Sequence, residues 1–290
     1  MNNQPNLKGT CVTKPIVYNK YKTCGHFGQA VNDFCEWLDK KVKDEEEPKV
    51  IDGKNVSVWI CLFGHSMGGL VAADAILKYR ELGAKISPKI VGLLAYDTPY
   101  YGLNYGLECE IVNDTCSCIS KISLKVKDTH TTSKSKVVLG FCAGAMICKH
   151  MGVIKDSIKD HFEFISALLK KDESKKRLDT LIQDSKLIFH CFYNLIPADD
   201  RAKTFISLPL KHMRQYFSPH ERDVSDVSDV SHEVIAHIAS MFDLEIDHSL
   251  DKLIAHITMF NPETNHEYNS LADHTTHQLL KMLENSVFRK

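Results

Sequence analysis

Residues 56–84 of the chain read VSVWICLFGHSMGGLVAADAILKYRELGA. The first part, 56–63, is a continuous apolar run, which is typical of a strand covered on both faces. After the glycine-rich segment 64–69, apolar residues recur at helical spacing until Gly83, which predicts the end of that helix. The stretch therefore predicts a strand, a tight turn and a helix in direct succession.

The segments on either side continue this alternation. Further strands are predicted at 12–18, 90–96, 187–196 and 204–210, and a further helix at 30–42 before a charged loop at 44–48. Strands that alternate with helices indicate a parallel sheet with helices on both faces. The sequence therefore predicts an α/β fold.

One segment interrupts the alternation. Between 103 and 180, loops and helices replace the strands, which predicts a helical insertion or lid within a single domain of residues 1–290. Segment 221–231 contains a repeated DVS triplet and predicts a solvated, low-complexity linker. The apolar run 137–148 is shorter than the roughly 20 residues of a membrane span, so no transmembrane segment is predicted. It could form a buried helix, a lid surface or, with nearby lysines, a peripheral membrane contact.

The composition excludes several classes of function. Hydrophobic residues make up 43% and charged residues 25% of the chain, as in ordinary globular proteins. The formal charge of -1 provides no positive field to gather nucleic acid.

The cysteines form no C-x-x-C pair and no signal peptide is recognised, which favours a cytoplasmic protein. No zinc, P-loop or dinucleotide motif is present, so we expect no metal or cofactor. The sequence leaves the oligomeric state open.

The segment 64–68, GHSMG, matches the G-x-S-x-G pattern of a nucleophile elbow. A serine hydroxyl is a weak nucleophile, so an enzyme must project it from a sharp turn where a base can reach it. Glycine at 64 and 68 avoids collisions within such a turn. The following helix directs its N–H groups, that of Met67 in particular, at charge developing on a substrate oxygen. We therefore predict Ser66 as the nucleophile and Met67 as the oxyanion donor; the alternative is an incidental glycine-rich turn.

The chain resembles the lipase-like serine esterase family of the α/β-hydrolase superfamily. The resemblance lies in VWICLFGHSMGGLVAADAILKY, in VGLLAYDTPYYGL with its threonine-proline turn, and in LIFHCFYNLIP and the C-terminal A-H-x-x-M-F with a following N-x-x-Y. It extends over about residues 15–283. It implies an α/β-hydrolase fold and a serine hydrolase that acts on a carboxylic ester, such as a lipid or another acyl ester. A thioesterase or transacylase would use the same residues.

The resemblance also implies an earlier strand that ends in a His-Gly loop and supplies a second oxyanion N–H. No such loop precedes the predicted strand at 12–18, so we expect an N-terminally shortened hydrolase domain. Three explanations stay open: a shortened product, a second donor from elsewhere, or a catalytically impaired scaffold that binds a lipid or protein partner. The segment Cys24-Gly25-His26 is a weak substitute for the missing loop.

A catalytic acid and a histidine must complete the site, and in hydrolases both follow the nucleophile in the chain. His256 and His237 share an IAHI context, and His256 is favoured because N-x-x-Y follows it. Asp97 in the D-T-P turn competes with Asp199 or Asp200 after the next strand, and is favoured because the turn is typical of this branch. The ordinary alternatives are a core-facing helical histidine and an aspartate that forms an Asx turn.

Overall fold

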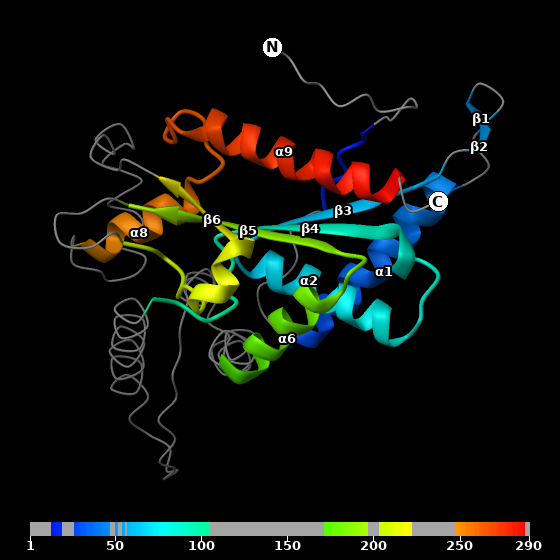
Figure 1. Ribbon diagram of the computed structural model, residues 1–290, viewed down its shortest axis with the longest axis horizontal. Coiled ribbons are helices and arrows are strands. Elements are labelled where there is room, and N and C mark those ends of the chain that lie inside the picture. The colour runs from blue at the N-terminus through cyan, green and yellow to red at the C-terminus, as the bar shows by residue number, and fades with distance from the viewer. Residues whose placement is uncertain are drawn as a thin grey trace, which may run out of the picture.

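The computed structural model describes residues 13–18, 26–46, 50–51, 54–55, 57–104, 171–196, 203–221 and 248–287. Figure 1 shows its elements along the chain. They are α1 (Phe27–Glu46), β1 (Val50–Ile51), β2 (Lys54–Asn55), β3 (Ile60–His65), α2 (Met67–Glu81), the 3₁₀ helix η1 (Ser87–Lys89), β4 (Ile90–Tyr96), α6 (Lys171–Gln183), β5 (Ile188–Leu195), the 3₁₀ helix η2 (Lys211–Tyr216), β6 (Phe217–Glu221), α8 (His248–Ile257) and α9 (Tyr268–Val287).

A parallel sheet of order β3-β4-β5-β6 forms the centre of the described structure. The register places His65, Tyr96 and Phe192 side by side on β3, β4 and β5. The carboxyl ends of these three strands therefore lie together at one edge. Strands β1 and β2 form a separate antiparallel pair. The predicted α/β arrangement with a parallel sheet is confirmed.

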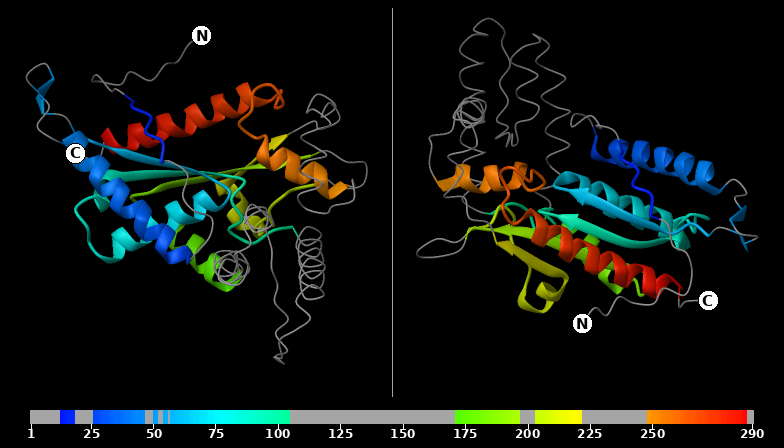
Figure 2. Two further views of the ribbon diagram at one scale, coloured as in Figure 1. Left: turned by 180° about the vertical axis from the view of Figure 1, so that it is seen from behind. Right: turned by 90° about the horizontal axis from the view of Figure 1, so that it is seen from above.

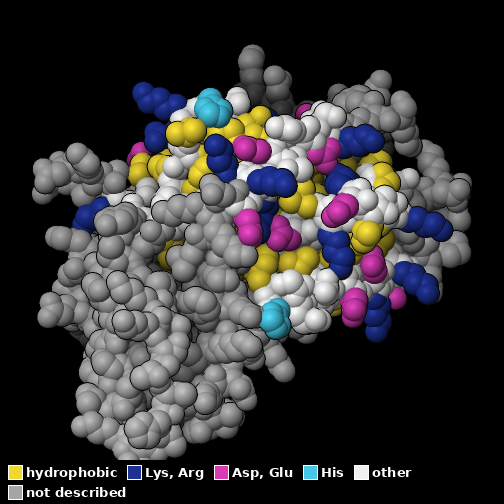
Figure 3. Space-filling view, turned by 90° about the horizontal axis from the view of Figure 1, so that it is seen from below, with side chains coloured by type: hydrophobic (Ala, Val, Ile, Leu, Met, Phe, Trp, Pro, Cys, Tyr) yellow, Lys and Arg dark blue, Asp and Glu magenta, His cyan; other side chains and the backbone are white. Residues whose placement is uncertain are grey.

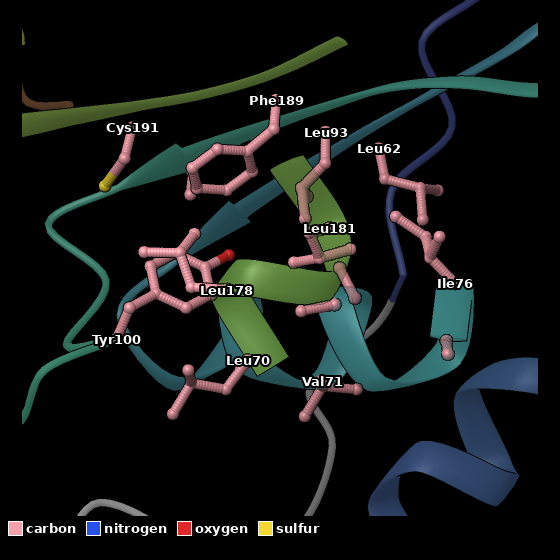
Figure 4. Packing of buried hydrophobic residues seen from close by; sticks show 14 of the residues in the cluster. Leu62, Leu70, Val71, Ile76, Leu93, Tyr100, Leu178, Leu181, Phe189 and Cys191 are labelled. Carbon is pink, nitrogen blue, oxygen red and sulfur yellow. The ribbon is translucent and has the colours of Figure 1, made fainter. Parts of the chain in front are cut away.

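Helices cover both faces of the sheet (Figures 1 and 2): α1, α2 and α6 lie on one face and α9 on the other. The larger core lies between the strands and the first three helices, and Figure 4 shows side chains of the strands directed at those of α2 and α6. A second apolar cluster lies beneath α9, where Leu271 and Met282 meet Leu94 and Phe192. Gly92 on β4 leaves the space that Met282 fills. Both faces of the central strand β4 are thus buried.

Two predicted strands are wrong, and one strand was not predicted. Residues 13–18 form no ladder; Pro15 has no N–H to donate, and Tyr18 packs its ring on Phe34 and Trp37 of α1. Residues 204–210 contain only an isolated bridge, between Ile206 and Leu103, and form no ladder. The unpredicted strand β6 reads FSPHE, and its proline is tolerated because β6 lies at the edge of the sheet that the described residues form.

The boundaries of other elements follow the sequence with local differences. Helix α2 ends just before Gly83, whose φ of 58° suits glycine. Helix α1 continues to Glu46, so the loop predicted from residue 44 begins later. Strand β3 is not covered on both faces as predicted: Ile60 and Leu62 are buried, but Phe63 is 51% exposed.

Most of the predicted insertion at 103–180 lies outside the described residues. Its end forms the first part of α6, where Arg177 pairs with Asp74 of α2 and Leu178 is fully buried. That part belongs to the layer beneath the sheet. The apolar run 137–148 and the linker after residue 221 also lie outside the described residues. None of the helices described here is long and apolar enough to cross a membrane.

Charged side chains of both signs interleave on the outer face of the layer that contains α1, α2 and α6. Figure 3 shows lysine and arginine side chains next to aspartate and glutamate on the described part of this face. An ion pair between Arg80 and Asp184 joins α2 to the segment that follows α6. Opposite charges therefore lie close together on this face.

We predict that Gly64→Ala destabilises the fold. A Cβ at residue 64 would lie 2.6 Å from the backbone N and Cα of Gly69, so β3 and α2 would have to separate. Overpacking of this kind costs about 1–3 kcal/mol of unfolding free energy or more. Thermal or urea unfolding measures the loss. Gly28→Ala is the matched control, because a Cβ there meets no atom within 4 Å. Equal stability of Gly64→Ala and the unchanged protein would contradict the prediction.

Candidate active site

Ser66 lies in the tight turn between β3 and α2. Its backbone has φ 53° and ψ −129°, a strained conformation for a residue with a side chain. The turn is this sharp because Gly64 and Gly69 bring the backbones of β3 and α2 into contact, which confirms the predicted steric requirement at Gly64. A Cβ on Gly69 would collide with the side chain of Thr98. The turns after β3 and β4 are therefore packed against each other.

The Ser66 hydroxyl bonds to His256 and does not cap the helix that follows it. Ser66 occupies the N-cap position of α2, where a serine oxygen normally accepts a bond from a backbone N–H of the first turn. It makes no such bond; instead Ser66 Oγ lies 2.9 Å from His256 Nε2. The hydroxyl can donate its proton to that nitrogen, which is the geometry required between a nucleophile and its base.

Asp97 holds the other nitrogen of the same imidazole. It directly follows β4, has φ 47° and is fully buried. His256 Nδ1 donates to Asp97 Oδ2 at 3.0 Å. Asn194 donates its side-chain amide to the same oxygen at 2.9 Å and its backbone N–H to Oδ1 at 3.2 Å. Three donors thus compensate the buried carboxylate, as a charge removed from water requires.

The register of the sheet explains why Ser66 and Asp97 meet. His65 and Tyr96 are paired on β3 and β4, so the residues that follow them leave the sheet at the same edge. The Ser66 N–H donates to the Tyr96 carbonyl at 2.9 Å. His256 comes from the last turn of α8, 190 residues from Ser66 along the chain. The structure therefore brings together Ser66, Asp97 and His256, the three residues favoured from the sequence.

The His256 ring lies between two other rings. The Phe205 ring stacks on it with centroids 3.7 Å apart and planes at 16°, and the His65 ring lies 4.5 Å away at 30°. The side chain of His256 is only 6% exposed. This packing restricts rotation of the imidazole and so keeps Nδ1 directed at Asp97 and Nε2 at Ser66.

His65 also contacts the backbone of α8. Its Nε2 lies 3.1 Å from the His256 carbonyl oxygen, and because a carbonyl only accepts, this nitrogen carries a proton and donates. Burial, together with the charge of His256, lowers the pKa of His65 from 6.5 to about 4. His65 is therefore neutral at pH 7 and adds no positive charge beside His256.

Met67 is the first residue of α2, so its backbone N–H has no acceptor within the helix. It lies next to Ser66 at the positive end of the helix dipole. This is the position expected of the predicted oxyanion donor. The role itself stays a prediction.

Three neighbours of this site were not predicted from the sequence: His65, Asn194 and Phe205. Asn194 carried a signal, because it is a polar residue near the end of the apolar strand IFHCFYNL. His65 carried a weaker one as the variable residue of the G-x-S-x-G pattern. Phe205 carried none, since its contact with His256 depends on how distant segments fold together.

The other sequence candidates, apart from His26, lie outside the described residues. Asp199, Asp200 and His237 lie outside the described residues, as do Cys24 and Gly25. His26 is described, and its carbonyl accepts bonds from the N–H groups of Gln29 and Ala30 at the start of α1. The alternatives Asp200 and His237 therefore stay untested as members of the site.

Within the described ranges, no group of three or more His, Cys, Asp or Glu side chains could hold a metal ion. Comparisons of the chain with models of protein families and with curated proteins found no match. The chemical interpretation of the site therefore depends on its own geometry and on the sequence motif.

We predict that the free energy of unfolding falls as the pH is lowered from 6.5 to 4, partly through His65. The unfolded state binds a proton on this histidine below about pH 6.5, whereas the folded state does so only near pH 4. His65→Gln should therefore reduce the slope of unfolding free energy against pH in this window, measured by urea denaturation. Equal slopes in His65→Gln and in the unchanged protein would contradict the prediction.

Proposed function

We propose that this protein is a serine hydrolase with an α/β-hydrolase-type domain, and that it cleaves a carboxylic ester. The observation that supports this most is the hydrogen-bonded series from Ser66 Oγ through His256 to Asp97, at a strained turn between a parallel strand and a helix. The chain order of nucleophile, acid and histidine agrees with the hydrolase order. Ser66 and Asp97 follow the carboxyl ends of β3 and β4, and His256 reaches them from α8.

In the proposed reaction, His256 first accepts a proton and later returns it. Ser66 Oγ attacks the ester carbonyl carbon while His256 Nε2 accepts the hydroxyl proton. Asp97 stabilises the imidazolium that forms, and the Met67 N–H stabilises the negative charge on the carbonyl oxygen. His256 then gives its proton to the departing alcohol. Water then attacks the acyl-serine while His256 accepts its proton, and His256 returns that proton to Ser66 Oγ as the carboxylic acid leaves.

An apolar rim beside the site favours an acyl ester as the substrate. Phe260 is 45% exposed and contacts the rings of His65 and Tyr96. Ile257, the residue after His256, is 48% exposed. Phe63 on β3 is exposed as well and stacks on Tyr96. The acyl chain of a lipid or another long-chain ester would cover these apolar side chains, which otherwise remain in contact with water.

Reaction with a fluorophosphonate probe tests the proposal. The unchanged protein should become labelled and Ser66→Ala should not, because the probe forms its bond with an activated serine oxygen. Asp97→Asn should lower the rate of labelling by about 10⁴, the loss seen when the histidine of such a site takes the wrong tautomer. Folding of each variant is checked by circular dichroism. Absence of labelling in the folded, unchanged protein would refute the proposal and favour a non-catalytic scaffold.

The repeated IAHI segment provides a matched control. His256→Ala should abolish labelling, whereas His237→Ala, a change in the same local sequence, should preserve it. Asp200→Ala is expected to preserve it too. The reverse result would assign the base to His237, or the acid to Asp200.

A further inference from the structure

Asn194 connects the candidate acid to the helix that carries the candidate base. It is the last but one residue of β5, and its side chain is 1% exposed. Its side-chain amide donates to Asp97 Oδ2 at 2.9 Å and to the carbonyl oxygen of Ala255 at 2.9 Å. Ala255 immediately precedes His256 on α8. One amide thus joins β5 to both β4 and α8.

We propose that Asn194 is a positioning residue, whose amide holds the Asp97 carboxylate and the backbone of α8 in the arrangement that brings His256 Nδ1 to Asp97. This inference rests on the proposed function for its catalytic consequence. The geometry on which it depends does not require catalysis. Asn194 acts through Asp97 and His256 and touches no reacting atom.

The orientation of the amide follows from its partners. A carboxylate oxygen and a backbone carbonyl both only accept, so the atom between them is the NH₂ group, and both of its protons are used. The backbone N–H of Asn194 donates to the other carboxylate oxygen of Asp97 at 3.2 Å. Both oxygens of Asp97 are therefore held by one residue, which fixes the plane of the carboxylate.

The remaining atom of the amide supports a role beyond packing. Asn194 Oδ1 is buried and has no hydrogen-bond partner in the described structure. An unpaired buried acceptor costs folding free energy, whereas the two donors of the same amide are both paired, with Asp97 and with the Ala255 carbonyl. An aspartate could not replace the amide, because its carboxylate would face the carboxylate of Asp97. Only the amide supplies two donors at this point.

The first experiment observes the position of the His256 proton directly. The proton on His256 Nδ1, bonded to a buried carboxylate, gives a far-downfield ¹H NMR resonance, identified by its loss in His256→Ala. Asn194→Ala should shift or broaden this resonance. Asn265→Ala is the matched control: Asn265 is also 1% exposed and donates to a backbone carbonyl, that of Met259, but does not touch the acid. Its removal should leave the resonance in place.

The second experiment is a double-mutant cycle on ester hydrolysis. Asn194→Ala should lower kcat by about 10- to 150-fold, the range that corresponds to one hydrogen bond to a charged group, with little change in KM. In an Asp97→Ala background the same change should lower kcat by a clearly smaller factor, because one of the two groups that the amide holds is gone. Asn265→Ala should have the same effect in both backgrounds. Asn194→Leu keeps most of the volume and removes the unpaired Oδ1. It takes the place of Asn194→Ala if that variant does not fold, and its kcat should fall by the same factor.

The outcomes separate this inference from the proposed function. If the unchanged protein neither hydrolyses esters nor reacts with the probe but the resonance responds to Asn194→Ala, the proposed function is wrong and Asn194 still positions Asp97 and His256. If the protein is active but resonance and kcat respond equally to the changes at Asn194 and Asn265, the positioning role is overturned. An equal loss with and without Asp97 would overturn it too.

Discussion

The close contact between the backbones of β3 and α2 is the constraint on which the rest of the described structure depends. Gly64 and Gly69 approach so closely that a Cβ on Gly64 would lie 2.6 Å from the Gly69 backbone. A chain that reverses in so little space forces Ser66 to φ 53°, and its hydroxyl makes no capping bond to α2. Thr98 of the neighbouring turn fills the space beside Gly69, so the ends of β3 and β4 are held together.

The buried carboxylate of Asp97 adds a second constraint. A fully buried charge needs several donors, and here they come from two elements that are distant in sequence: Asn194 on β5 and His256 on α8. Burial of one side chain thus connects three elements at the carboxyl edge of the sheet. The rings of Phe205 and the neutral His65 enclose the imidazole without adding charge. The same contacts that stabilise this edge of the fold also fix the geometry of the candidate site.

The elements that the sequence predicted well are those whose environment is uniform. Strands β4 and β5 are buried on both faces, so their residues are apolar almost without interruption. Strand β6 was missed because an edge strand accepts proline and histidine in FSPHE, and segment 204–210 was mistaken for a strand because its apolar residues pack without forming a ladder. Asn194 escaped notice because the value of its amide depends on partners 97 and 61 residues away along the chain.

By itself, the sequence determined what depends on neighbouring residues: the succession of strand, sharp turn and helix around Ser66, and the alternation that produces a parallel sheet. Its glycines sit where a turn has no room for side chains, and that requirement is local. The choice of partners for Ser66 was not local. His256 and His237 share the same IAHI context, so no short-range property separates them. Only the tertiary structure brought His256 and Asp97 to Ser66, because their meeting depends on the register of β3 with β4 and on the position of α8 against β5.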